Sequence, residues 1–334
     1  MNYHGFPSIS VVIPTWNGRS LLETMFPSLL AALGFYEQLS GSAWEIIVVD
    51  DGSSDGTVRW VETIPEKRVK IVTRRRNGGF AAACNAGFSA CHHEVVVLLN
   101  NDVLVAKEFL PPLVRHFQAD KIFAVTCKAL GKDRETFCTG GKIGEFRRGF
   151  WKAFQNYDVA SGQQGNQQWI SFAVCGGFCA FDRRKLIDLG GFEPLMSPFY
   201  WEDVELSYRA WKRGWKILYE PESVVFHDAS TTIRGQFRKG RIERISQRNR
   251  LIFLWKNLHD PLMLLAHLGF TFLLVLQAIL LFRPALLLGF WDTLKLFPAI
   301  FPKRIQERRL RVVGDRQLRK MFQQFQKEAS VLLK

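Results

Sequence analysis

Trp44-Glu-Ile-Ile-Val-Val-Asp-Asp-Gly-Ser-Ser-Asp-Gly56 is the stretch that decides the fold. Residues 44–50 are apolar on both faces, which predicts a fully buried strand, and two aspartates and a Gly-Ser turn follow it. Similar apolar runs predict strands at residues 8–14, 69–73, 94–100 and 122–128. Apolar residues at helical spacing between and after these runs predict helices at residues 19–33, 57–64, 79–90, 107–117 and 201–214.

Strands that are apolar on both faces and alternate with helices are typical of a parallel sheet covered on both sides. We therefore predict an α/β fold class with a mostly parallel central sheet. Ligands of such sheets bind beyond the carboxyl ends of the strands. The candidate binding residues are those that follow the predicted strands, at 14–18, 50–54, 74–79 and 100–102.

Carboxylates stand at the ends of two of these strands. Asp50 and Asp51 could accept hydrogen bonds from a nucleobase, or they could stabilise a turn. Asp102 could hold a divalent cation that bridges two phosphates, since Mg²⁺ and Mn²⁺ prefer oxygen ligands, or it could cap the next helix. Taken singly, each position leaves both interpretations open.

Three further groups have both a chemical and a structural interpretation. Glu202 and Asp203 open a predicted helix, where a carboxylate could act as a general base on a hydroxyl or could complement the helix dipole. His227 follows an extended segment and could be a metal ligand or a structural side chain. Arg74-Arg-Arg76 before a glycine turn suits a diphosphate, and a run of solvated charge is the alternative.

Ordered motifs give these residues a common context. They are Ser10-Val-Val-Ile-Pro-Thr-Trp-Asn17, Ile47-Val-Val-Asp-Asp-Gly-Ser-Ser-Asp-Gly-Thr57, Asn77-Gly-Gly-Phe-Ala-Ala-Ala-Cys-Asn-Ala-Gly87, Leu98-Leu-Asn-Asn-Asp102, and Gly190-Gly-Phe192 with Trp201-Glu-Asp-Val-Glu-Leu-Ser-Tyr-Arg209. Through about residues 8–230 the chain resembles family 2 glycosyltransferases, most of all the rhamnosyltransferase-like branch of bacterial surface-polysaccharide enzymes. The resemblance implies a GT-A fold, which is Rossmann-like with helices on both faces of the sheet.

The resemblance also implies roles for individual residues. Asp203 would be the catalytic base, and Trp201 and Glu202 would shape the acceptor site. Asp102 would bind a divalent cation, Mn²⁺ or Mg²⁺, with His227 as a further ligand. The family's usual Asp-x-Asp is here Asn100-Asn-Asp102, and this single carboxylate favours a contribution from His227. The nucleotide would be bound by Pro14, Thr15, Asn17, Asp50, Asp51, Asn77, Gly79 and Asn101.

The implied reaction is an inverting transfer of a sugar from a dTDP-, UDP- or GDP-linked donor to a saccharide hydroxyl, in the synthesis of cell-surface polysaccharide. Two alternatives stay open. One is a polyprenyl-phosphate sugar synthase, whose acceptor is a phosphate, and the other is a non-enzymatic scaffold that binds a membrane or nucleic acid. Residues 130–168 are predicted to be irregular and to recognise the acceptor, with Gln163, Gln164, Gln167, Gln168 and Trp169 as candidates.

The net charge of +14 is confined to the C-terminal part of the chain. Residues 1–228 carry equal numbers of acidic and basic side chains, whereas residues 229–334 carry 20 basic and 6 acidic ones. Residues 261–282 have no formal charge, and a helix there would be about 33 Å long, enough to cross a ~30 Å hydrocarbon core. A second apolar stretch covers residues 284–301.

Basic residues that flank apolar helices favour an anionic membrane surface as the partner, and we expect no nucleic-acid partner. Three arrangements of the apolar stretches are possible. A hairpin or monotopic insertion keeps both basic flanks on one side of the membrane, whereas a single span places them on opposite sides. The third arrangement is a soluble helical domain that does not enter a membrane. We therefore expect the chain at the cytoplasmic face of the inner membrane, with a lipid-linked acceptor. The predicted organisation is a catalytic domain over 1–230, divided into a nucleotide-sugar half (1–128) and an acceptor half (129–230), and a basic helical region over 231–334.

Two further expectations concern the compartment. The six cysteines include no CxxC pair, which predicts reduced thiols in the cytosol. Residues 1–10 lack the pattern of a cleavable signal peptide.

Overall fold

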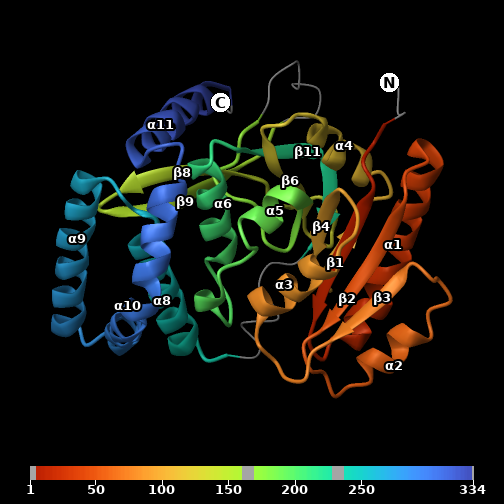
Figure 1. Cartoon of the computed structure of the whole chain (residues 1–334), viewed down its shortest axis with the longest axis horizontal. Helices are drawn as coiled ribbons and strands as arrows, with labels where there is room; N and C mark the ends of the chain where they lie inside the picture. The colour runs from red at the N-terminus through yellow and green to blue at the C-terminus, as the bar shows by residue number, and fades with distance from the viewer. Residues whose placement is uncertain (1–4, 160–168, 228–236, 333–334) are drawn as a thin grey trace.

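The computed structural model describes residues 5–159, 169–227 and 237–332. The predicted α/β fold is confirmed: a central sheet with helices on both faces is followed by four helices, α8 to α11 (Figure 1). The strand order of the sheet is β3-β2-β1-β4-β10-β6-β11-β5, and β7 pairs with β6. The strands are β1 Ile9–Thr15, β2 Trp44–Asp50, β3 Val69–Thr73, β4 Val95–Leu99, β5 Leu104–Val105, β6 Ile122–Leu130, β7 Phe137–Thr139, β10 Phe178–Asp182 and β11 Lys216–Phe226.

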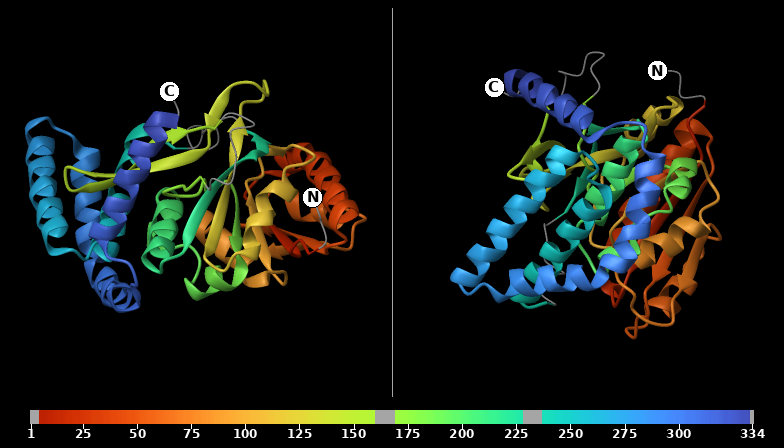
Figure 2. Two further views of the ribbon diagram at one scale, coloured as in Figure 1. Left: turned by 90° about the horizontal axis from the view of Figure 1, so that it is seen from above. Right: turned by 60° about the vertical axis from the view of Figure 1, so that its left-hand side comes forward.

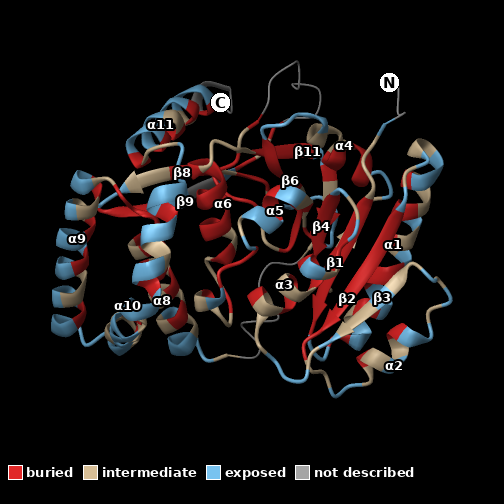
Figure 3. Cartoon of the chain, viewed as in Figure 1, coloured by how far each residue is buried: buried red, intermediate tan, exposed pale blue. Residues whose placement is uncertain are grey.

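The strands β3, β2, β1 and β4 are parallel neighbours, as the sequence predicted. β10 runs antiparallel between β4 and β6, so the whole sheet is mixed. Alternate residues of a strand pack on opposite faces: Val12 lies in one core cluster with α3, and Val11 lies in the other with α1. Figure 3 shows β1, β2 and β4 as buried, whereas β3 at the edge of the sheet is only partly covered. The helices around the sheet are α1 Arg19–Ser40, α2 Thr57–Glu62, α3 Phe80–Ala90, α4 Leu110–Val114, α5 Arg183–Asp188 and α6 Glu202–Lys212.

Two helices differ from the prediction by three residues or more at a boundary. α1 continues beyond residue 33 and ends at Gly41, whose φ of 69° gives the left-handed C-cap that glycine favours. The helix predicted at 107–117 begins only at Leu110 and becomes a 3₁₀ helix at Arg115. Pro111 and Pro112 explain the late start, because proline fits only the first turn of a helix.

The prediction of irregular structure over residues 130–168 is wrong for β7 and for the hairpin of β8 (Gly141–Arg147) and β9 (Phe150–Tyr157). Arg148 and Gly149 form the hairpin turn with positive φ values of 48° and 74°, as a two-residue turn requires. The hairpin is stabilised by distant partners, since the Trp151 ring stacks on Phe172 with 5.3 Å between centroids. Such partners leave no periodic signal in the local sequence.

The structure describes only one of the residues that we predicted as candidates for acceptor recognition. Gln163, Gln164, Gln167 and Gln168 lie outside the described residues. Trp169 is buried in a small core cluster beside Tyr157. The structure therefore gives Trp169 a packing role and not an exposed position.

The C-terminal helices are α8 Lys239–Asn257, α9 Pro261–Leu280, α10 Pro284–Leu310 and α11 Asp315–Leu332. α10 packs along α8, and α9 lies at the outer edge of the molecule (Figure 2). Buried polar contacts fix the group to α6: the Tyr208 hydroxyl donates to Asp315 (2.7 Å), and Lys256 pairs with Glu205 (2.9 Å). α9 and α10 are both long and apolar enough to cross a membrane.

Candidate active site

The carboxyl ends of β3, β2, β1 and β4 meet at one edge of the sheet. The parallel register pairs Thr15 with Asp50 and Asp50 with Thr73, and Pro14 is buried beside Thr15. The backbone N–H of Asp51 donates to the Thr15 carbonyl (2.9 Å), which ties the ends of β1 and β2 together. We call this region the carboxyl edge and define it by residues 14–18, 50–54, 74–79 and 100–102.

The buried carboxylate of Asp51 organises the glycine turn after β3. It accepts hydrogen bonds from the backbone N–H groups of Gly78 (3.0 Å) and Gly79 (2.9 Å). It also pairs with Nη1 of Arg74 at 2.7 Å. Arg74 is thereby held at the carboxyl edge, whereas the other two arginines of the run, Arg75 and Arg76, are exposed.

Asp50 and Thr15 are buried at the carboxyl edge, at the last positions of β2 and β1. One oxygen of Asp50 accepts from the Ser53 N–H (3.1 Å), and Oδ1 is buried without a hydrogen-bond partner in the described part of the chain. A buried acceptor of this kind is costly unless a ligand donates to it. Thr15 Oγ1 accepts from Asn101 Nδ2 (2.8 Å), and a Cβ on Gly18 would lie only 2.1 Å from that nitrogen.

Two asparagines shape the loops of the carboxyl edge. Asn17 has a φ of 48° and accepts from the N–H of Ser54 (2.8 Å). Asn77 accepts from the N–H of Gly79 (3.0 Å), whose φ is 88°. A Cβ on Gly79 would lie 2.8 Å from Cα of Pro198, so glycine is what allows the segment before α6 to approach this edge.

Asp102 and His227 face each other although they are far apart in the sequence. Oδ1 of Asp102 lies 3.5 Å from Nε2 of His227. His227 directly follows β11, its N–H donates to the Leu130 carbonyl (2.8 Å), and its ring lies 5.7 Å from that of Phe178. In the residues that the structure describes, no three or more His, Cys, Asp or Glu side chains are grouped as metal ligands. The pair therefore offers two ligands.

Asp203 lies in the first turn of α6, with its side chain 21% exposed. Nζ of Lys142, from β8, lies 3.7 Å from Oδ2 of Asp203, and the N–H of Gly176 donates to the same oxygen (3.4 Å). Burial tends to lower the pKa of Lys142, but the charges of Cys175 and Asp203 more than offset this and raise it. A charged ammonium and a backbone N–H thus point at one carboxylate oxygen.

Two glycines join Asp203 to the carboxyl edge. The Gly177 carbonyl accepts from the N–H of Asn100 (2.8 Å), and a Cβ on Gly177 would lie 2.6 Å from Nδ2 of that asparagine. A Cβ on Gly176 would lie 3.2 Å from Cβ of Asp203. Because neither glycine has a side chain, the start of α6 and the end of β4 come together.

Glu202 and Glu205 are both buried in α6 and differ in their partners. Burial, reinforced by the charge of Asp203, raises the pKa of Glu202 to about 8, and its Oε2 has no hydrogen-bond partner among the described residues. Burial by itself would also raise the pKa of Glu205, but Arg209 and Lys256 lower it to about 2. Glu202 is therefore protonated at neutral pH, whereas Glu205 is an ionised structural group.

Trp201 precedes α6 in a strained backbone. Tyr200 and Trp201 have φ values of 73° and 75°, which residues other than glycine rarely adopt. Asn249 of α8 donates to the Tyr200 carbonyl (2.9 Å), and Trp201 Nε1 donates to Ser246 Oγ (3.1 Å). The Trp201 ring also stacks on Phe253, so α8 holds the segment in which Glu202 and Asp203 begin.

The sequence-based candidates thus fall into two sets, one at the carboxyl edge and one at the start of α6. Sequence reasoning missed Lys142, because this residue lies in the stretch that we predicted to be irregular. The alternation of small, polar and apolar residues in Gly141-Lys-Ile143 was the available signal of a strand. Trp16 lies in the candidate range 14–18 without an assigned role, and its large aromatic ring is 40% exposed beside Thr15.

Comparison with known proteins bears on the family and the fold of this chain. The family described as "Glycosyl transferase family 2" matches residues 10–190, more than half of the chain. The poly-beta-1,6-N-acetyl-D-glucosamine synthase of Staphylococcus aureus is 26% identical over 246 residues, 72% of this chain and 54% of that protein. An undecaprenyl-phosphate 4-deoxy-4-formamido-L-arabinose transferase of Pectobacterium carotovorum is 37% identical over 112 residues, 33% of each protein. The chain spans about half the length, or less, of these curated relatives.

Two solved structures share the GT-A fold. GalNAc-T7 with UDP, GalNAc and Mn²⁺ has a TM-score of 0.59 at 20% identity, covering 77% of this chain and 49% of the other. A mannosyltransferase of Pyrobaculum calidifontis in complex with GDP-Man and Mn²⁺ has a TM-score of 0.55 at 21% identity, covering 88% and 76%. At such identities the likeness establishes the fold of this chain and no more.

Proposed function

The chain belongs to glycosyl transferase family 2, and we propose that it transfers a sugar from a nucleotide-diphosphate donor to a hydroxyl of a lipid-linked saccharide. The observation that carries this proposal is the meeting of two sets of residues. The carboxyl edge offers acceptors and N–H groups for a nucleotide, and Asp203 lies beside it through Gly176 and Gly177. Of the two related structures, one contains GDP-Man and the other contains UDP and GalNAc.

In this proposal Asp203 takes the proton of the acceptor hydroxyl while that oxygen attacks the anomeric carbon. The nucleoside diphosphate leaves from the opposite face, so a single displacement inverts the configuration. Lys142, at 3.7 Å, fixes the orientation of the Asp203 carboxylate. The protonated Glu202 places a neutral neighbour beside the base, which avoids a second negative charge at the acceptor.

Asp102 at the carboxyl edge and His227, which faces it, fit a divalent cation. Asp102 and His227 would hold it, because a carboxylate oxygen and an imidazole nitrogen 3.5 Å apart suit Mn²⁺. When bound, the cation offsets the charge that grows on the leaving diphosphate. Since the described part of the chain gathers only these two ligands here, donor phosphate oxygens would complete the coordination.

The orientation of α9 supports association with a membrane. Its buried residues include the polar His267 and Thr271. His267 is held from both sides, by the Gly149 carbonyl (2.9 Å) and by Trp255 Nε1 (3.1 Å). Leucines point the other way, and Leu265 is 67% exposed. A helix that packs its polar residues against the protein and exposes its leucines is suited to a lipid environment and not to water.

Most of the exposed large apolar side chains of the described residues lie in α9, α10 and the turns next to them. Apart from Trp16, Phe137 and Ile187, every exposed large apolar side chain of the described residues lies between 262 and 312. At 20 residues, α9 is about 30 Å long. We favour insertion of α9 and α10 as a hairpin or monotopic unit at the cytoplasmic face of the inner membrane, since this keeps the basic α8 and α11 on one side.

A polyprenyl-phosphate sugar synthase is the second candidate. The observation that favours it is the likeness of a third of the chain to a transferase named for undecaprenyl phosphate. The two candidates differ in the acceptor atom, which is a saccharide hydroxyl in one and a phosphate oxygen in the other. The division of the chain into catalytic domain and basic helical region is common to both.

The test begins with the full chain in detergent and a panel of dTDP-, UDP- and GDP-sugars, with and without Mn²⁺. Thermal stabilisation by one donor, dependent on Mn²⁺ and weakened in Asp102→Ala, is the expected result. Product analysis then compares undecaprenyl phosphate with a lipid-linked saccharide as acceptor. Stabilisation by no nucleotide sugar would contradict the proposed function, and a glycosyl phosphate product would favour the second candidate.

A further inference from the structure

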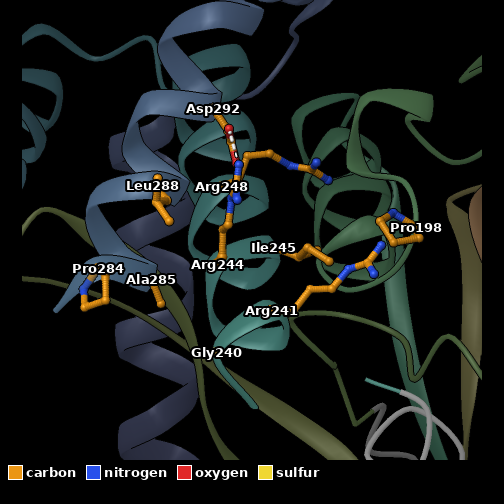
Figure 4. A pocket seen from close by; sticks show the side chains of 10 residues that line it. All are labelled: Pro198, Gly240, Arg241, Arg244, Ile245, Arg248, Pro284, Ala285, Leu288 and Asp292. Carbon is orange, nitrogen blue, oxygen red and sulfur yellow. Dashed lines mark hydrogen bonds and ion pairs between the residues drawn. The ribbon is translucent and has the colours of Figure 1, made fainter. Parts of the chain in front are cut away.

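A pocket of about 630 Å³ lies between α8 and α10, outside the proposed catalytic residues (Figure 4). This volume is within the range of small-molecule sites, ~300–1,000 Å³. Its walls come from the first half of α8, the start of α10, and Pro198 in the segment before α6.

One wall of the pocket is cationic. Arg241, Arg244 and Arg248 recur at three- and four-residue spacing, which places them on one face of α8. A single carboxylate of the lining opposes them, Asp292 of α10, and Arg244 holds it by contacts of 2.6 and 2.8 Å. Within the described residues, Arg241 and Arg248 have no carboxylate partner at ion-pair distance, so two positive charges remain for a ligand.

The two remaining guanidinium groups are held in place. Arg248 donates to the Ser197 carbonyl and to Oδ1 of Asn249 (2.9 Å). Arg241 lies over the ring of Phe237 (5.0 Å) and extends toward Pro198 in Figure 4. Fixed guanidinium groups are the usual partners of phosphate oxygens, because each offers several N–H donors in a fork.

The opposite wall is apolar and continues onto the exposed helix surface. Pro284, Ala285 and Leu288 of α10 line it. Phe282, two residues before Pro284, is 90% exposed in the turn between α9 and α10. A cationic wall that faces an apolar one fits an amphipathic ligand, with an anionic head and a hydrocarbon chain that leaves along α10.

Pro198 connects this pocket to the carboxyl edge. Its carbonyl accepts from the N–H of Phe80 (3.1 Å), and its Cα is what a side chain on Gly79 would strike. The preceding Ser197 donates from Oγ to the Gly78 carbonyl (2.8 Å). A group bound between Arg241 and Pro198 is therefore separated from the glycine turn of the carboxyl edge, at Gly78 and Gly79, only by the segment that contains Ser197 and Pro198.

We propose that this pocket binds the phosphate or diphosphate of the lipid that carries the acceptor, with Arg241 and Arg248 on its oxygens and the hydrocarbon chain along Ala285 and Leu288. This inference rests on the proposed function and adds the place where the acceptor lipid is held. The source of the phosphate is the carrier lipid, and not a bulk phospholipid headgroup or free pyrophosphate. The saccharide on the diphosphate would then extend past Pro198 toward Asp203.

The test measures binding of farnesyl diphosphate to the full chain in detergent by calorimetry, against farnesol, inorganic pyrophosphate and phosphatidylglycerol vesicles. Farnesyl diphosphate should bind at least about tenfold tighter than pyrophosphate or farnesol, since it alone uses both walls. Arg241→Ala should weaken it about tenfold by removing a charge. Ala285→Trp should weaken it by filling the pocket while leaving every arginine in place.

Arg309→Ala is the matched control, because it removes an exposed arginine of α10 that does not line the pocket. It should bind farnesyl diphosphate as the wild type does. Three results would each overturn the proposal. The first is that Arg241→Ala binds farnesyl diphosphate as tightly as the wild type, and the second is that the wild type binds pyrophosphate as tightly as farnesyl diphosphate. The third is that Arg241→Ala loses as much affinity for the vesicles as it loses for farnesyl diphosphate. Wild type that binds a nucleotide sugar but not farnesyl diphosphate would contradict this inference alone, whereas wild type that binds no nucleotide sugar would contradict the proposed function.

Discussion

β2 and α9 are both mostly apolar in sequence, and the structure buries them to opposite degrees. All seven residues of β2 are buried in the sheet. Of the 20 residues of α9, only Met263, His267, Thr271 and Ala278 are buried, and two of these are polar. Apolar composition alone therefore identifies a segment that avoids water. The structure shows which side of such a segment packs against protein and which side stays exposed.

α6 packs on one side against β11 of the sheet and on the other against α8 and α11. The largest expected effect tests whether the chemistry lies at the start of this helix. Asp203→Asn should reduce transfer by ~10²–10⁴-fold, because a positioned general base contributes about that much. Nucleotide-sugar binding should be retained, since the carboxyl edge is unchanged. Steady-state transfer rates and donor affinity of the variant check both parts, with Asp188→Asn, on the exposed side of α5, as the control. Normal turnover in Asp203→Asn would remove this residue from the mechanism.

A matched pair of leucines tests the comparison of sheet and helix directly. Leu98 of β4 is fully buried, and Leu265 of α9 is 67% exposed. Leu98→Ala should lower the free energy of unfolding by about 2–5 kcal/mol, because it leaves a cavity. Leu265→Ala in detergent should change it by less than about 0.5 kcal/mol. Urea unfolding followed by tryptophan fluorescence checks the pair, and equal losses would mean that α9 is packed as tightly as the sheet.

The pH dependence of stability distinguishes Glu202 from the paired carboxylates around it. Because the pKa of Glu202 is raised from 4.5 to about 8 in the folded state, its contribution is fully present below about pH 4.5 and is lost as the pH rises through about 8. Glu202→Gln should therefore gain stability relative to wild type between about pH 5 and pH 9, by a few kcal/mol. Unfolding free energies of both proteins across this range check the sign. A constant difference would show that Glu202 does not titrate in this window.

The smallest expected effect concerns the exposed side of α9. Leu265→Glu should weaken partition onto anionic vesicles by about tenfold or more, since an exposed leucine contributes ~1.5–3 kcal/mol when it enters an apolar phase. Donor binding in detergent should be unchanged, because α9 does not contact the carboxyl edge. Sedimentation with vesicles measures the partition. Thr24→Glu on the exposed side of α1 is the control for added charge.

Much of the carboxyl edge could be predicted from the sequence. Thr15, Asp50, Asp51 and Asn101 follow strands whose apolar runs are local signals, and parallel strands bring their carboxyl ends together whatever the rest of the chain does. The roles of these residues stay predictions that the proposed experiments test. The pairing of Asp102 with His227 was expected only from the resemblance, and the structure places the two side chains 3.5 Å apart.

Other features depended on contacts between distant segments. Lys142 reaches Asp203 only because β8 and β9 form a hairpin, and this hairpin is held by Phe172 and by the C-terminal helices. The Gly149 turn of the same hairpin fixes His267 and so sets which side of α9 faces outward. No local pattern in 130–168 encodes either arrangement.

The sequence by itself determined the α/β fold, the loops that carry the polar residues and the apolar, basic character of the C-terminal part, because these follow from periodicity and composition over short windows. Only the tertiary structure decided how Asp203 is surrounded, which face of α9 is exposed and where Arg241 and Arg248 meet Pro198. Each of these depends on packing between segments far apart in the chain, and packing is decided by the shapes of all partners together and not by any one stretch of sequence.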